Sequence, residues 1–164
     1  MKKTLLILIL IFSLFLIGCS FFTPEPKEFS KEGITLTLDE SFKENTNDIH
    51  KVTFASTKVV FTGNYETLSS NLSIKEYANL CLESINSNEE ALEYTDDETN
   101  FVYSYYTNTV EDVMLGQDVT YKYMLVCMKG ESNKYYCMNF GTTENKFDDY
   151  KDQIFEWAKT IKVE

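Results

Sequence analysis

The apolar and polar residues of this chain follow two different periods, one typical of strands and the other of helices. Residues 34–38 alternate strictly between aliphatic and threonine side chains, as a half-buried strand does. Further strands are expected in five runs rich in β-branched and aromatic residues, at 51–56, 58–64, 101–110, 119–128 and 135–140. The last two runs are expected to form a hairpin across a polar turn at 130–133. The last three carry apolar residues on both faces, which favours a sheet covered on both sides.

Two further segments have apolar residues at helical spacing. The first, residues 72–86, opens with Ser73 and Glu76 in the positions of a capping box. Its apolar face consists of Ile74, Tyr77, Ala78, Cys81, Leu82 and Ile85. The second, residues 143–159, has Thr143 as its expected N-cap. Its apolar face continues to Ile161 and consists of Phe147, Tyr150, Ile154, Trp157, Ala158 and Ile161. The order of elements predicts an α+β fold with two main amphipathic helices.

A different pattern occupies the start of the chain, where a long apolar run follows two lysines. The run covers residues 4–17, which suits a secretory signal but is shorter than a membrane-spanning helix of about 20 residues. It ends in Leu16-Ile17-Gly18-Cys19, which resembles the lipobox of bacterial lipoproteins. The resemblance implies that Cys19 becomes the first residue of the mature chain and carries a diacylglyceryl group and an N-acyl group. The alternative is a retained signal anchor with an incidental cysteine.

These features divide the chain into three parts. Residues 1–18 are expected to be the signal peptide, residues 19–31 the lipidated cysteine and a flexible tether, and residues 32–164 a single domain. The tether is predicted because this segment has no apolar period and holds both prolines of the chain. We therefore expect the domain to lie on the outward side of the cell membrane, with the lipid as its anchor.

The charge of the chain supports the need for an anchor. The net charge is −11, with 26 acidic residues and 15 basic residues, all of them lysine. An acidic chain without arginine is unsuited to nucleic acid, because phosphate contacts need clustered basic side chains. Anionic lipids also repel such a chain, so the acyl groups must hold it at a membrane. Abundant asparagine and lysine without arginine favours an A+T-rich genome, as in low-G+C Gram-positive bacteria.

Three cysteines, Cys81, Cys127 and Cys137, remain after Cys19, and their spacing matches no zinc-binding pattern. Cys127 and Cys137 flank the expected hairpin turn, so the length of that turn decides whether they face each other. A four-residue turn points the two thiols to opposite sides of the sheet, whereas a three- or five-residue turn pairs them directly. A disulfide between Cys127 and Cys137 is therefore one alternative, and two small apolar core residues the other.

Other candidate site residues are acidic or aromatic. Asp96, Asp97 and Glu98 lie at an expected turn and are a candidate metal site, because calcium binds carboxylate oxygens. The alternative is a solvated acidic run. The single histidine, His50, has no expected catalytic partner and is predicted to be an exposed loop residue. Seven tyrosines lie in the expected strands and have two possible roles. They either line a groove for carbohydrate or peptide or pack in the core, and they are Tyr103, Tyr105, Tyr106, Tyr121, Tyr123, Tyr135 and Tyr136.

Three segments together resemble the PsbP-like (Mog/PsbP) family, which includes the DcrB-type bacterial lipoproteins. They are residues 29–38 with Phe42, the hairpin over residues 121–140, and the closing helix with its apolar residues Phe147, Ile154 and Trp157. The resemblance implies an α/β/α sandwich around a central, mainly antiparallel sheet. It also implies a non-enzymatic accessory or partner-binding role, as is typical of the family.

The expected function is thus that of a membrane-anchored, extracytoplasmic lipoprotein without catalytic activity, acting as an accessory or partner-binding module. The expected partners are the membrane, through the lipid, and an envelope protein of unknown identity, with no nucleic acid. No cofactor is expected beyond the acyl groups on Cys19. The alternative function is a receptor for a small ligand, whether peptide, carbohydrate or metal, that uses the tyrosine-rich face of the sheet.

Overall fold

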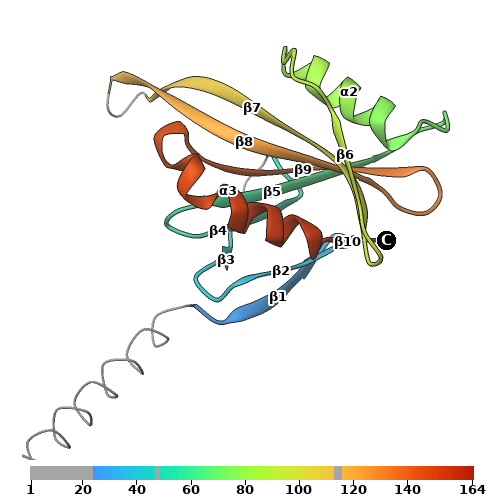
Figure 1. The fold of residues 1–164 in the computed structure, drawn as a ribbon, viewed down its shortest axis with the longest axis horizontal. Helices are drawn as coiled ribbons and strands as arrows, with labels where there is room; N and C mark the ends of the chain where they lie inside the picture. The colour runs from blue at the N-terminus through green and yellow to red at the C-terminus, as the bar shows by residue number, and fades with distance from the viewer. Residues whose placement is uncertain (1–23, 47–48, 113–115) are drawn as a thin grey trace, which may run out of the picture.

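The structure is a computed structural model that describes residues 24–46, 49–112 and 116–164. The predicted signal peptide, the lipobox and the lipidated Cys19 lie outside the described residues. In the described part of the chain, two antiparallel sheets and two helices form the fold (Figure 1). None of the described helices combines the length and the apolar content needed to cross a membrane.

The larger sheet has seven strands in the order β3-β4-β5-β9-β8-β7-β6. Its members are β3 (Lys43–Glu44), β4 (Val52–Ala55), β5 (Val60–Thr67), β6 (Leu92–Thr95), β7 (Asn100–Asp112), β8 (Gln117–Lys129) and β9 (Lys134–Thr143). The smaller sheet has three strands in the order β1-β2-β10, namely β1 (Pro26–Lys31), β2 (Ile34–Asp39) and β10 (Lys162–Val163). Neighbouring strands in both sheets run antiparallel.

The two helices cover opposite faces of the larger sheet. Helix α2 (Ile74–Ser84) lies on one face, and helix α3 (Glu144–Lys159) lies on the other together with the smaller sheet (Figure 1). We call these faces the α2 face, which includes Val102 and Leu125, and the α3 face, which includes Phe101 and Met124. The predicted α+β sandwich with a mainly antiparallel sheet and two main helices is confirmed.

The capping box at the start of α2 is also confirmed. The Glu76 amide donates to Ser73 Oγ over 3.1 Å, and the Ser73 amide donates to the Glu76 carboxylate over 2.7 Å. Two otherwise unpaired amides at the helix start are thereby satisfied. Thr143 is the N-cap of α3, as expected, but its hydroxyl donates to Asn145 Oδ1 and makes no capping bond.

The prediction of a flexible tether as far as Lys31 is wrong for its second half. Residues 26–31 form strand β1, which pairs with β2 from Pro26 opposite Asp39 to Lys31 opposite Ile34. Phe29 is buried there, with its ring centroid 5.0 Å from that of Phe54. Pro26 is tolerated because it is the first residue of an edge strand, where a missing amide hydrogen breaks no ladder. The folded domain therefore begins before residue 32.

Candidate functional site

The register of the β8–β9 hairpin brings Cys127 directly opposite Cys137. Lys129 pairs with Tyr135, so the connection is the five-residue alternative. The Gly130 amide donates to the Lys134 carbonyl over 2.9 Å and closes the turn. Hydrogen-bonded and non-hydrogen-bonded pairs alternate along an antiparallel ladder, so Cys127 and Cys137 form a non-hydrogen-bonded pair, in which side chains lie closer together.

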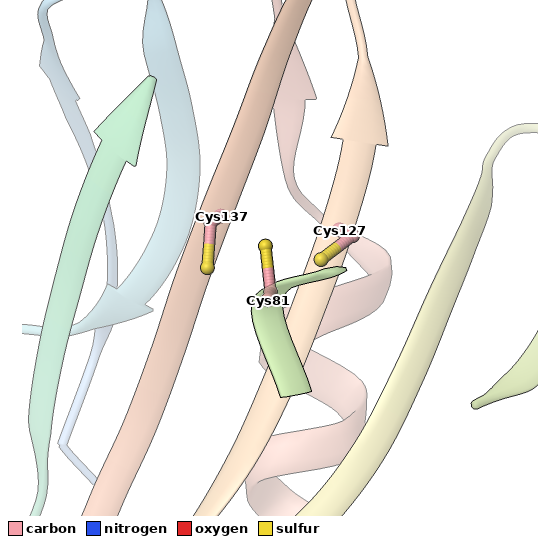
Figure 2. A group of neighbouring side chains, drawn as sticks. All are labelled: Cys81, Cys127 and Cys137. Atoms are coloured by element: carbon pink, nitrogen blue, oxygen red, sulfur yellow. The ribbon is translucent and has the colours of Figure 1, made fainter. Parts of the chain in front are cut away.

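A third cysteine reaches the same point from the helix. Cys81 projects from α2 toward the strand pair, and Figure 2 shows its sulfur between those of Cys127 and Cys137. The three Sγ atoms lie within 4.8 Å of one another. Cys127 is buried, Cys81 and Cys137 are partly buried, and all three are free thiols. The candidate disulfide of the sequence is therefore part of a larger group, which we call the thiol cluster.

The packing of α2 explains why Cys81 points inward. Tyr77, one turn earlier, is buried and lies against Tyr135 of β9, with ring centroids 4.9 Å apart. The Tyr77 hydroxyl donates to Glu66 over 3.0 Å, and that of Tyr135 donates to the Leu72 carbonyl over 2.7 Å. These contacts hold the helix in one orientation, and a residue four positions after Tyr77 shares its face.

The thiols change one another's acidity. Hydrogen bonds from Cys127 and Cys137 lower the pKa of Cys81, because they stabilise its thiolate more than burial opposes it. The hydrogen bonds with Cys137 and Cys81, together with burial, raise the pKa of Cys127. The three thiols therefore titrate as one coupled group, in which Cys81 loses its proton more readily than Cys127.

No helix of the described residues covers the remainder of the α2 face, which forms a pocket of about 810 Å³. Its floor includes Tyr106 of β7, Tyr121 and Tyr123 of β8, and Asn139 and Gly141 of β9. Ile85, just after α2, lies at one side, and the first turns of α3 lie at the other with Lys146 and Tyr150. We call this cavity the tyrosine pocket.

The floor of the tyrosine pocket is held by specific contacts. The rings of Tyr106 and Tyr123 are stacked, with centroids 4.9 Å apart and planes inclined by 13°. The Tyr106 hydroxyl donates to Asn139 Oδ1 over 3.0 Å. A Cβ atom at Gly141 would lie 2.5 Å from the Tyr123 ring, so the ring can rest on the strand only because this residue is glycine. Burial raises the pKa of both tyrosines, so they are neutral hydroxyl groups at ordinary pH.

The lining of the tyrosine pocket differs in charge from the rest of the chain. Among the described residues, the lining contains Lys58, Lys146 and His50 but no aspartate or glutamate, although the chain has 26 acidic residues. His50 lies outside the helices and strands, as predicted, but the prediction that it is exposed is wrong, because it is partly buried at the pocket wall. Asn64 Nδ2 donates to His50 Nδ1 over 2.9 Å, and burial lowers the pKa of the histidine. The pocket therefore presents amine, amide and hydroxyl donors.

The seven strand tyrosines divide between the core and the tyrosine pocket, and ligand binding at the pocket stays a prediction. Tyr103 and Tyr105 pack on the α3 face against Phe155 and Phe147, and Tyr135 and Tyr136 are buried. Tyr106, Tyr121 and Tyr123 line the pocket. The division follows from strand alternation, since residues one position apart point to opposite faces.

The candidate metal ligands Asp96, Asp97 and Glu98 do not form a group of converging ligand atoms. The Asp96 carboxylate accepts hydrogen bonds from the Tyr94 hydroxyl and from the amides of Glu98 and Thr99, which closes the turn between β6 and β7. Among the residues that the structure describes, the group of ligand atoms close enough to share one metal ion is the thiol cluster. The structure thus gives no support to calcium at Asp96, Asp97 and Glu98, and that site stays a prediction.

Several residues of these two sites were missed in the sequence. Cys81 lies 46 positions before Cys127 in the chain, so no spacing pattern links them. Asn139, Lys58 and Lys146 are unremarkable locally and meet only because β5, β9 and α3 meet. Gly141 alone carried a signal, because a glycine inside a strand pattern indicates a close approach of another group.

Comparison with known proteins identifies the fold. No family model matches the sequence, and no curated protein matches it. The structure is similar to the solution structure of cyanobacterial PsbP (CyanoP) from Synechocystis sp. PCC 6803, with a TM-score of 0.53 and 10% sequence identity. The similarity covers 88% of this chain and 96% of that chain. The domain therefore has a PsbP-like fold.

Proposed function

We propose that this protein is a non-catalytic binding protein, held on the outer side of the cell membrane by lipid on Cys19, and that the tyrosine pocket is its binding surface. The pocket carries the proposal. The PsbP-like fold is compatible with an accessory role, but a fold by itself does not establish a function. The lipobox resemblance at Leu16-Ile17-Gly18-Cys19 supports the anchor and, with it, a bacterial lipoprotein of the DcrB type.

The pocket has the chemistry of a recognition surface. Its three tyrosines offer apolar ring faces for stacking together with hydroxyl groups for hydrogen bonds. Tyrosine also loses little conformational entropy on binding, because only two side-chain torsions are ordered. The stacking of Tyr106 on Tyr123 and the bond to Asn139 order part of this surface before a ligand arrives. The first expected occupant is a segment of an envelope protein partner.

A second candidate function is that of a small-ligand receptor, and the charge of the pocket favours it. The described lining has the ammonium groups of Lys58 and Lys146 and no carboxylate, which favours a ligand that carries hydroxyl groups and an anionic group. Acidic carbohydrates and acidic peptides have that composition. The volume of about 810 Å³ lies within the range of ordinary ligand pockets, about 300–1,000 Å³.

One matched pair of variants tests the binding surface. Tyr121 and Tyr103 are both partly buried strand tyrosines, but only Tyr121 lines the pocket, whereas Tyr103 lies on the α3 face. A photo-crosslinking residue at position 121 of the full chain should capture an envelope protein in native membranes, and one at position 103 should not. Equal capture of protein at positions 121 and 103 would contradict the proposal. The absence of any protein captured at position 121, together with the absence of any ligand that raises the melting temperature, would contradict it as well.

The ligand screen uses the melting temperature of the full chain in detergent with acidic and neutral sugars and peptides. A ligand at about 100 times its Kd stabilises the folded state by about 2.7 kcal/mol. The expected shift occurs with an acidic ligand, disappears in Tyr121→Ala and persists in Tyr103→Ala. A shift that persists in Tyr121→Ala places the ligand elsewhere and rules out the receptor function of the pocket.

The anchor is tested separately. Cys19→Ala should abolish incorporation of labelled fatty acid and release the protein from the membrane or leave it as precursor, because the thioether cannot form. Ser20→Ala is the matched control and should be labelled as the unaltered chain is. Unchanged labelling and membrane attachment of Cys19→Ala would refute the lipid anchor.

A further inference from the structure

We propose that Cys81, Cys127 and Cys137 bind one thiophilic metal ion, Cu(I) or Zn²⁺, in a three-sulfur site between α2 and the larger sheet. The proposal goes beyond the binding function of the pocket. It rests on the convergence of three side chains from three elements on one point (Figure 2).

The geometry fits a metal with small adjustments. A metal–sulfur bond of about 2.3 Å places three bound sulfurs about 3.8–4.0 Å from one another. The three Sγ atoms already lie within 4.8 Å of one another. Small rotations of the cysteine side chains are enough to close the difference, so the backbone of the hairpin and of α2 can stay in place.

A disulfide explains less of this arrangement. The Cys127–Cys137 pair can form one bond, but the third sulfur, that of Cys81, then has no partner of its kind. A disulfide joins only two sulfurs, whereas one metal ion can bond to all three at once. Small core residues would fill the space equally well, but they would not require sulfur at all three positions.

The ligand set selects the class of metal. Soft sulfur ligands favour Cu(I) and Zn²⁺ over Ca²⁺ and Mg²⁺, which prefer oxygen. Three sulfurs complete the coordination of Cu(I), whereas Zn²⁺ keeps a fourth position for water. Each thiol that binds as a thiolate releases its proton to solvent, so the site becomes negatively charged, less so with Zn²⁺ than with Cu(I).

The tyrosine pocket and the thiol cluster are neighbours on the α2 face. Tyr106 and Ile85 line the pocket, and Tyr106, like Cys81 and Cys137, packs against the buried group that contains Cys127. Asn139, two residues after Cys137 on the same face of β9, belongs to the pocket floor. The thiol cluster therefore lies next to the tyrosine pocket, and its partly buried members are Cys81 and Cys137.

The test measures metal binding by the full chain, purified in detergent with reductant and without chelator. Cu(I) and Zn²⁺ are added separately, each in competition with a coloured chelator, and bound metal is counted by elemental analysis. We expect one ion per chain, with release of thiol protons and slower alkylation of all three cysteines. Tight binding of Cu(I) alone identifies a three-coordinate copper site. Tight binding of Zn²⁺ with a water ligand identifies a four-coordinate zinc site.

Cys81→Ala is the decisive variant, because alanine is the best helix former and leaves β8 and β9 intact. It should weaken binding by more than about 100-fold, the upper limit for loss of a mere outer-shell partner. Asn79→Ala on the exposed side of the same helix is the matched control and should bind as the unaltered chain does. If Cys81→Ala fails to fold, the protection of thiols from alkylation in the unaltered chain decides the question.

Three results would overturn the proposal. The first is the absence of stoichiometric binding of either ion while all three thiols remain reduced. The second is unchanged affinity in folded Cys81→Ala. The third is a Cys127–Cys137 disulfide in protein taken from cells under conditions that trap thiols.

Discussion

The two faces of the larger sheet are built from the same strands but are covered to different extents. The α3 face is closed by a helix and a second sheet, and its core joins aromatic residues from β4, β5, β9 and α3. The α2 face is covered by one helix of 11 residues, and its core is smaller. The thiol cluster lies between this helix and the sheet, and the tyrosine pocket occupies the part of the face that the helix leaves uncovered. One face therefore provides most of the core, whereas the other keeps a pocket open.

The largest expected difference concerns a ring on each face. Phe140 is fully buried on the α3 face, between Phe61 and Trp157. Phe140→Ala should lower the free energy of unfolding by about 3–5 kcal/mol, because it removes a buried ring and leaves a cavity. Tyr123→Ala, on the pocket floor, should cost only about 1 kcal/mol, since that ring is partly exposed. Urea unfolding followed through Trp157 fluorescence measures both, and equal losses would contradict the division between the faces.

The next effect tests how the pocket is formed. Gly141→Ala should lower the free energy of unfolding by about 1–3 kcal/mol, because the new methyl group occupies space held by the Tyr123 ring. The same change in a Tyr123→Ala background should be nearly neutral, since the obstructing ring is absent. Melting curves of the four proteins give the coupling energy. Strictly additive losses would show that the ring does not depend on the glycine.

A smaller effect compares the starts of the two helices. Ser73→Ala removes a capping bond and should cost about 1 kcal/mol. Thr143→Ala removes a hydroxyl that makes no capping bond and should cost a few tenths of that. Urea titrations give the size of each loss, and hydrogen exchange shows whether the first loss is confined to α2. A larger loss for Thr143→Ala would reverse the comparison.

The smallest effect is a dependence on pH at the same cap. Hydrogen bonds from the backbone and hydroxyl of Ser73 lower the pKa of Glu76 below its ordinary value of 4.5. The Glu76 carboxylate therefore binds a proton more readily in the unfolded chain than in the folded chain. Its stabilising effect is complete above the ordinary pKa and is lost as the pH falls through the lowered pKa of the folded state. Glu76→Gln should therefore flatten the loss of stability between about pH 5 and pH 3. Ser84→Ala is the control for α2, and a slope unchanged in Glu76→Gln would contradict this origin.

Much of the local structure could be predicted because it depends on neighbouring residues. The alternation of residues 34–38, the capping box at Ser73 and the apolar stripes of both helices are short-range patterns, and each is found as expected. The extent of β1 could not be predicted, because a segment with prolines and charges becomes a strand only when β2 is beside it. The placement of His50 failed for the same reason, since a pocket wall depends on distant strands.

The sequence by itself determined the two element types, their order, the acidic charge and the lipobox pattern, since each is a property of contiguous residues. Only the tertiary structure decided which of them meet. The hairpin turn was open to three lengths, and the five-residue turn placed Cys127 opposite Cys137. The packing of α2 then added Cys81, and the short reach of that helix left the tyrosines of β7 and β8 uncovered. Register and packing are long-range properties, so one step in either would have separated the three sulfurs.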